Sequence, residues 1–161
     1  MVIPEGVLFR GGPDQKVRKE LLEQFNVHTI LSLPAGCFLP YTGVKTNVIF
    51  FDRPKDGSGT KSVWYYELTN DGFELKQTRK PIDGGQLPDF LSKWKNRIQG
   101  ENSWTVQIKE IIERGYDLSA KNPNRKDDYE HRPALELVQS IKAKEERIMD
   151  LLGELETILE K

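Results

Sequence analysis

The chain has 161 residues, of which 37% are hydrophobic and 30% are charged. This length is within the range of one domain, and the charged fraction predicts a modest globular part with a strongly solvated extension. The 24 basic and 25 acidic residues leave a formal net charge of −1. Free-standing DNA-binding domains are usually basic, so any nucleic-acid contact is expected to be local or shared with partners. A neutral domain that touches no DNA fits the composition as well.

The single cysteine, Cys37, excludes an intramolecular disulfide, and no cluster of cysteine and histidine indicates a metal site. We interpret Cys37 as a small core residue. The sequence has no signal peptide and no apolar run approaching about 20 residues, which favours a cytoplasmic chain that does not enter a membrane.

The first nine residues have the pattern of a strand that is already under way. The apolar letters MVIP are followed by Glu5 and Gly6 and then by a second apolar pair. Complete domains seldom begin inside a strand, so we interpret the N-terminus as a truncation point. After a break of glycine and proline, Asp14 is expected to cap a helix that stops near Asn26. The apolar positions of that helix are Val17, Leu21, Leu22 and Phe25.

Two buried strands are predicted next, at Val27–Leu33 and Asn47–Phe51, because both are short apolar runs rich in β-branched or aromatic residues. With the preceding helix, Val27–Leu33 makes one βα unit of a mostly parallel sheet. The connection between the strands, LPAGCFLPYTGVKT, is too long for a tight hairpin and too apolar to be disordered. Its prolines and glycines predict a shaped loop, which we interpret as the working face.

The segment Ser62–Leu68 is predicted to be a strand that forms an antiparallel hairpin with Asn47–Phe51. Its side chains alternate between two faces, and its aromatics are Trp64, Tyr65 and Tyr66. These rings have the chemistry of a stacking platform for bases. We favour the alternative that they pack the two faces of the sheet.

The remaining globular part is expected to contain short elements. Residues 77–83 have the composition of an exposed basic link, and a helix from Leu87 is expected to end by Gly100. A short strand, Ser103–Val106, leads into a helix that Gly115 stops. Residues 116–128 read as a polar linker. The domain boundaries that follow are a globular part at residues 1–118, a linker at 119–131 and a long helix at 132–161.

The last segment, residues 132–161, has a heptad pattern of apolar residues, interrupted by Lys144 and Glu145. At about 1.5 Å per residue such a helix is too long to lie on so small a domain. We therefore interpret its apolar stripe as an exposed coiled-coil seam for another helix. A terminal helix folded back on its own core is the alternative. The residues assigned to the docking stripe are Ile141, Ile148, Leu151, Leu152, Leu155 and Ile158.

Several segments occur in the order and spacing of a known family: VIPEGVLF, KVRKELLEQFNVHTILSLPAGCFLPYTGVKTNVIFFDR, WYYEL, ENSWTV and IIERGYDLSAKNPNR. In these segments the chain resembles the C-terminal part of the modification (M) subunit of type I restriction-modification systems. Those subunits are adenine-N6 DNA methyltransferases that use S-adenosylmethionine.

The resemblance implies an α/β fold, namely the C-terminal portion of a Rossmann-like methyltransferase sheet with parallel strands, an antiparallel hairpin and a long C-terminal helix. The family's glycine-rich cofactor loop and Asn-Pro-Pro-aromatic catalytic motif do not occur in this sequence. Asn122-Pro123-Asn124 is no substitute, because it lacks the second proline and the aromatic. We therefore expect that the chain alone holds no cofactor, has no catalytic residues and is inactive, while S-adenosylmethionine serves the complete subunit.

The resemblance also implies a site and partners. In related enzymes the loop before the antiparallel strand forms a wall for the extruded adenine. The expected partners are the specificity (S) subunit, the upstream part of the M subunit and, in the assembled complex, DNA; alone, the chain is expected to self-associate through its last helix. The alternative is a non-catalytic interaction or assembly module. The residues assigned to the target-base loop are Phe38, Pro40, Tyr41, Gly43, Lys45, Thr46 and Asn47.

Overall fold

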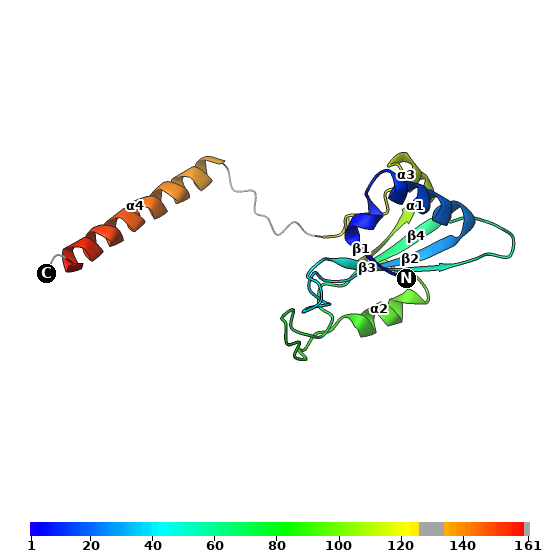
Figure 1. Ribbon diagram of the computed structural model, residues 1–161, viewed down its shortest axis with the longest axis horizontal. Coiled ribbons are helices and arrows are strands. Elements are labelled where there is room, and N and C mark those ends of the chain that lie inside the picture. The colour runs from blue at the N-terminus through cyan, green and yellow to red at the C-terminus, as the bar shows by residue number, and fades with distance from the viewer. Residues whose placement is uncertain (126–133, 160–161) are drawn as a thin grey trace. The chain divides into compact units, whose positions relative to one another are not determined.

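The computed structural model describes residues 1–125 and 134–159. The chain divides into two compact units, residues 1–125 and residues 126–161. The first unit carries a five-stranded sheet with helices on its faces, and the second carries helix α4 (Figure 1). Within the described residues, no helix is long and apolar enough to span a membrane.

The sheet has the strand order β1-β3-β2-β4-β5. Strand β3 pairs antiparallel with both β1 and β2, and β4 pairs antiparallel with β5. The β2–β4 pair is parallel. The sheet is therefore mixed. The strands span Val2–Pro4 (β1), Asn26–Ser32 (β2), Thr46–Asp52 (β3), Ser62–Glu67 (β4) and Ser103–Gln107 (β5).

Two predictions about the sheet are wrong. The hairpin partner of β3 is β2, and β4 lies on the opposite side of β2, so Ser62–Leu68 and Asn47–Phe51 do not pair. The sheet is also not mostly parallel, because β3 lies between β1 and β2 and runs against both. The βα unit is present, with helix α1 (Pro13–Gln24) between β1 and β2, but its two strands are not neighbours.

The connection from β3 to β4 explains why these strands separate. It crosses the start of β2, where the Thr60 backbone N–H donates to Leu22 O (2.8 Å) and the Thr60 hydroxyl accepts from Val27 N–H (2.8 Å). A Cβ at Gly59 would lie 2.7 Å from the carbonyl oxygens of Leu22 and Glu23. The close crossing therefore requires glycine at this position.

Both faces of the sheet are covered. Helices α1 and α3 (Ile108–Glu113) cover one face, and α2 (Leu87–Trp94) covers the other (Figure 1). Along β4, Val63 and Tyr65 lie in the first layer while Trp64 and Tyr66 lie in the second. All four are at most 4% exposed, which confirms that the aromatics pack the sheet and excludes a base-stacking platform. Cys37 is also buried, as predicted.

Helix α1 presents a different face from the one predicted. Leu22 is buried, but Val17 is 63% exposed and Arg18 is buried in its place. The guanidinium of Arg18 donates to Val7 O and to Tyr116 O, both at 2.7 Å, and burial lowers its pKa. Asp14 lies in the first turn, and Gly12 occupies the N-cap. One buried cation thus joins the N-terminal turn, α1 and the segment after α3.

The end of the first unit lies beyond the predicted boundary at residue 118. Leu118 N–H donates to Leu8 O (2.9 Å), and the amide side chains of Asn122 and Asn124 donate to Glu101 O and Gly100 O (both 2.8 Å). Residues 119–125 of the predicted linker therefore contact the sheet domain. The rest of that linker lies outside the described residues.

Helix α4 spans Ala134–Leu159, close to the predicted limits of 132–161. Taken by itself, the helix leaves the apolar side chains of its stripe exposed, by 43% for Leu151 to 64% for Ile141. The side chain of Ile158 lies outside the described residues. The other exposed members of the predicted stripe are Ile148, Leu152 and Leu155.

Arg18→Met is expected to lower the free energy of unfolding by about 1–3 kcal/mol per unpaired carbonyl, because two buried acceptors lose their charged donor. Urea unfolding followed by circular dichroism measures this. The matched control is Lys16→Met on the same helix, where the lysine is exposed and makes no described salt bridge. Equal midpoints for the two variants would contradict the bridging role of Arg18.

Candidate functional site

Two long loops lie at the same edge of the sheet. Residues 33–45 follow the carboxyl end of β2, and residues 68–86 follow the carboxyl end of β4. Because β2 and β4 are parallel, both loops leave the sheet in the same direction (Figure 1). In open α/β sheets, ligands bind at the carboxyl ends of parallel strands. This edge is therefore the candidate site.

The first loop folds through its own backbone hydrogen bonds. The N–H of Leu39 donates to Gly36 O (3.1 Å), and that of Tyr41 donates to Phe38 O (2.9 Å). Cys37 is buried, with its sulfur 3.7 Å from the hydroxyl of Thr46. The loop is thus a series of tight turns over a buried thiol, in agreement with the prediction of a shaped loop.

Arg79 clamps the two loops together. Its guanidinium donates to the backbone carbonyl of Cys37 in the first loop and to the carboxylate of Asp71 in the second. The same guanidinium lies 5.3 Å from the ring centroid of Phe73. The Arg79 and Asp71 side chains are only 22% and 11% exposed, so solvent screens this ion pair weakly. The first loop is therefore held by its own backbone hydrogen bonds and by Arg79 of the second loop.

The second loop is anchored where it joins α2. The side-chain oxygen of Gln86 accepts from the N–H groups of Thr69 (2.8 Å) and Asn70 (3.1 Å). The hydroxyl of Tyr66 donates to Asp89 (2.7 Å), which also accepts from Lys93 (2.7 Å). The bond from Lys93, and then that from Tyr66, lower the pKa of Asp89. Strand β4, the second loop and α2 are thereby fixed to one another.

The seven residues predicted for the target-base loop fall into an outer group in the loop and a buried group in β3. Tyr41 is 92% exposed and Phe38 is 41% exposed, so neither ring belongs to the buried core. Pro40 and Gly43 are also exposed, and the Leu39–Pro40 peptide is cis. The Lys45 ammonium is 3.3 Å from the carboxylate of Glu5. These residues form the outer part of the loop.

Thr46 and Asn47 do not belong to the exposed part of the loop. Both are residues of β3 and are 6% and 2% exposed, so their assignment to a DNA-facing loop is corrected. Asn47 is opposite Ile3 on β1 and Ser32 on β2. Its side-chain nitrogen has no hydrogen-bond partner among the described residues. A buried amide donor is thus left unpaired where the sheet meets the loop.

Sequence reasoning missed Arg79 and Asp71. It placed Arg79 in an exposed basic link and gave Asp71 no role, because contacts between distant loops leave no local pattern in the sequence. The sequence does contain the opposite charges of Asp71 and Arg79 near Phe73, but it does not show which residues they contact.

Known proteins are similar to this chain over the whole sheet domain, including the two loops. The description of the N-6 DNA methylase family fits residues 1–132. The chain belongs to this family. It is 36% identical, over 99% of its length, to the type I restriction enzyme EcoEI methylase subunit of Escherichia coli. This confirms the resemblance to type I modification subunits. The chain spans 33% of that relative's length.

Solved structures from type I restriction-modification systems share the fold. A chain from a structure of a type I restriction-modification system is 40% identical, with a TM-score of 0.68 over 99% of this chain and 35% of that one. The type I methyltransferase subunit from Streptococcus thermophilus is 27% identical, with a TM-score of 0.61 over 78% of this chain and 26% of that one. The mixed sheet is therefore a methyltransferase-like sheet.

Among the described residues, neither the Gly11-Gly12 turn nor the cavity lined by His28 and Arg97 has the features of a site for S-adenosylmethionine. A nucleoside cofactor in such folds is held by a glycine-rich turn and by a carboxylate on the ribose. Gly11 and Gly12 have open space around them and do not approach a second element, and the cavity lined by His28 and Arg97 contains no carboxylate among its lining residues. No step involving the cofactor is therefore assigned to this part of the chain.

Arg79→Ala should loosen the first loop without unfolding the sheet, because the clamp joins two loops and no strand depends on it. Limited chymotrypsin digestion with mass spectrometry is expected to show faster cleavage after Phe38 and Tyr41, with little change in the melting temperature. Lys80→Ala is the matched control, since this neighbouring lysine is exposed and makes no described salt bridge. Cleavage at the wild-type rate would contradict the clamp.

Proposed function

We propose that this chain supplies one wall of the target-adenine pocket in a type I DNA adenine-N6 methylase subunit. The observation that carries the proposal is Tyr41, an aromatic side chain that is 92% exposed at a loop whose turns and Arg79 clamp fix its position. Enzymes that modify a base extrude it from the duplex and hold it against aromatic or apolar side chains. An exposed ring on a fixed loop is suited to that task.

The two exposed rings of the loop have separate roles in this proposal. Phe38 is half-exposed near the clamp, while Tyr41 is almost fully exposed, so Tyr41 is the stacking surface and Phe38 supports it. Lys45 is paired with Glu5, but 35% of its side chain remains exposed. An ammonium in this position can exchange its surface ion pair for a DNA phosphate.

The chemistry of methyl transfer lies elsewhere in this proposal. The groups that hold the cofactor and orient the adenine amine belong to other parts of the subunit, and the subunit acts in the cytoplasm, where its DNA is. The chain contributes a surface that holds the target base in position. Its role is therefore to place the target correctly, which is a substantial part of catalysis for two bound reactants.

Tyr41→Ala in a full-length subunit, assembled with its specificity subunit, should reduce DNA methylation about tenfold or more, because stacking contributes about 1–3 kcal/mol per base. Tyr41→Phe, which keeps the ring, is expected to retain most of the activity. Lys45→Gln should weaken DNA binding. Transfer of a radiolabelled methyl group to a duplex measures turnover, and a gel-shift titration with the same duplex measures DNA affinity, with the isolated chain as an inactive control. Wild-type turnover and DNA affinity in Tyr41→Ala and Lys45→Gln would refute the pocket assignment.

We propose a second role for α4, as the surface that docks on the specificity subunit. The described members of its stripe repeat at heptad spacing and are large aliphatic residues. Burial of such side chains stabilises association by about 25 cal/mol per Å² of apolar surface. This role would remain if the chain were a non-catalytic assembly module, so it is separate from the base pocket.

The double substitution Leu151→Asp and Leu155→Asp should abolish binding of the full-length subunit to its specificity subunit, because two charges would enter an apolar seam. Ala143→Asp with Met149→Asp is the control, since these residues lie on α4 outside the stripe. Size-exclusion chromatography with light scattering measures the complex. If both pairs bind equally well, the docking stripe is wrongly assigned.

A further inference from the structure

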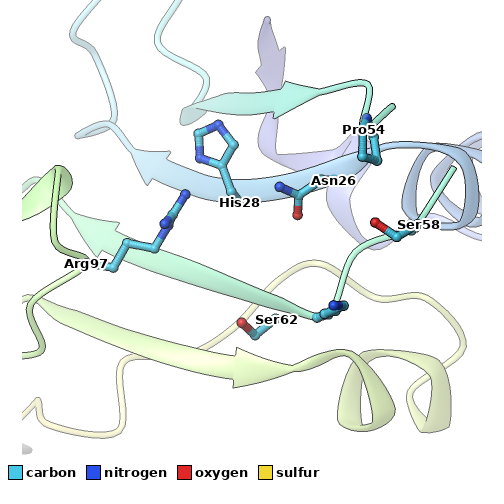
Figure 2. A pocket seen from close by; sticks show the side chains of 8 residues that line it. Asn26, His28, Pro54, Ser58, Ser62 and Arg97 are labelled. Atoms are coloured by element: carbon cyan, nitrogen blue, oxygen red, sulfur yellow. The ribbon is translucent and has the colours of Figure 1, made fainter. Parts of the chain in front are cut away.

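A cavity of about 240 Å³ lies at the end of the sheet where β2 and β4 begin. The target-base loop leaves the opposite end of the same strands, so this cavity is separate from the site described above. It is bordered by β2, by the connection that crosses the sheet and by the turn after α2 (Figure 2). Its lining residues are Asn26, His28, Pro54, Ser58, Gly59, Lys61, Ser62 and Arg97.

The lining is rich in hydrogen-bond donors and contains no acidic residue. Lys61 and Arg97 make no salt bridge or side-chain hydrogen bond among the described residues, and none is described for the side chains of Asn26 and Ser62. The nearby carboxylate of Asp56 is already engaged, because it accepts from the N–H (3.1 Å) and hydroxyl (2.8 Å) of Ser58. The lining therefore offers cationic and neutral donors and no carboxylate, while the charge of Lys61 also acts on Asp56 beside the cavity.

The position of Arg97 is fixed by an unusual backbone. Its φ angle is 49°, a conformation that residues other than glycine seldom adopt. The turn is held at the next residue, where Ile98 O accepts from the indole N–H of Trp64 (3.2 Å) and from the Ser103 hydroxyl (2.9 Å). The backbone that carries Arg97 is thus held by contacts with the buried sheet, while the Arg97 side chain is exposed. Backbone strain of this kind is concentrated at functional sites.

His28 lies opposite Arg97 and is packed against aromatic rings. Its ring centroid is 6.4 Å from that of Phe50 and 6.5 Å from that of Trp94, and its Nδ1 is 3.0 Å from the Thr29 hydroxyl. Burial lowers the pKa of His28, the positive charge of Arg97 lowers it further, and Asp52 opposes both. Figure 2 shows Arg97 extending towards the His28 ring. Two basic groups therefore face each other across the cavity.

We propose that this cavity binds a phosphate group. A guanidinium, an ammonium, the Ser62 hydroxyl and the Asn26 amide line it, and these donors suit the tetrahedral oxygens of phosphate. A bound dianion would favour the protonated form of His28, which burial and the charge of Arg97 disfavour. The end of β3 and the connection that borders the cavity also carry Arg53 and Lys55, together with the carboxylates of Asp52 and Asp56. The proposal does not depend on the target-base pocket.

The test is titration of the full chain with inorganic phosphate at constant ionic strength, followed by NMR signals of backbone amides, arginine Nε–H and histidine rings. Saturable shifts are expected at His28, Ser62 and Arg97. Lys61→Gln and Arg97→Gly should each weaken binding about tenfold or more, since each removes a charged donor. Glycine keeps the positive φ angle at residue 97. The matched control is Lys16→Gln, which removes an exposed lysine from α1 and should leave binding unchanged.

A second arm identifies where the phosphate comes from. A short fluorescein-labelled DNA duplex is added, and inorganic phosphate competes with it. If the duplex shifts the same signals and the two compete, the site binds the nucleic-acid backbone; if phosphate binds and the duplex does not compete, the site takes a free phosphate compound. Both results support a phosphate site. The absence of saturable shifts, or equal affinity in the two cavity variants and the control, would overturn the proposal.

Discussion

The parallel pairing of β2 with β4 determines how the rest of the first unit is arranged. This pairing is possible because the connection after β3 crosses the start of β2 through Gly59 and Thr60. Thr60 replaces the strand contacts that are missing at the crossing, since its hydroxyl accepts from Val27 N–H and donates to Phe25 O (2.8 Å). An antiparallel hairpin of β3 and β4 would leave the direction of β4 unchanged but would place β3 between β2 and β4, so the two long loops would not leave from neighbouring strands.

The same pairing produces two different ends of the sheet. At the carboxyl ends of β2 and β4, exposed rings and a clamped loop face outwards. At the amino ends, basic and hydroxyl side chains gather around a cavity. The layer of rings on the α2 face runs between these ends, from His28 through Phe50 and Trp94 to Phe90 and Tyr66. Both ends therefore rest on one packed aromatic layer.

The sequence predicted most of the elements and fewer of their contacts. Runs of β-branched and aromatic residues marked β2, β3 and β4, and the alternation along β4 correctly predicted two buried faces. The strand order was not predictable in this way, because periodicity shows which residues are buried and does not show which strands are neighbours. Arg18 was missed for a related reason: a lone arginine on a helix is expected in solvent. For the candidate site, the sequence correctly placed Phe38 and Tyr41 in a shaped loop, and their role at a target base stays a prediction. Thr46 and Asn47 were also placed in the loop, although β3 begins with them.

Substitutions in β4 affect the packed layers on both faces of the sheet. A strand with one wet face has alternate positions at which substitutions are close to neutral, but β4 has buried side chains in succession from Val63 to Tyr66. A change of volume at Tyr65 must be accommodated by α1, α3 and Trp104, and one at Trp64 by Phe90 and Trp94. Accepted substitutions in this strand are therefore expected to occur together with changes in the covering helices, so that β4 and these helices vary as one unit during evolution.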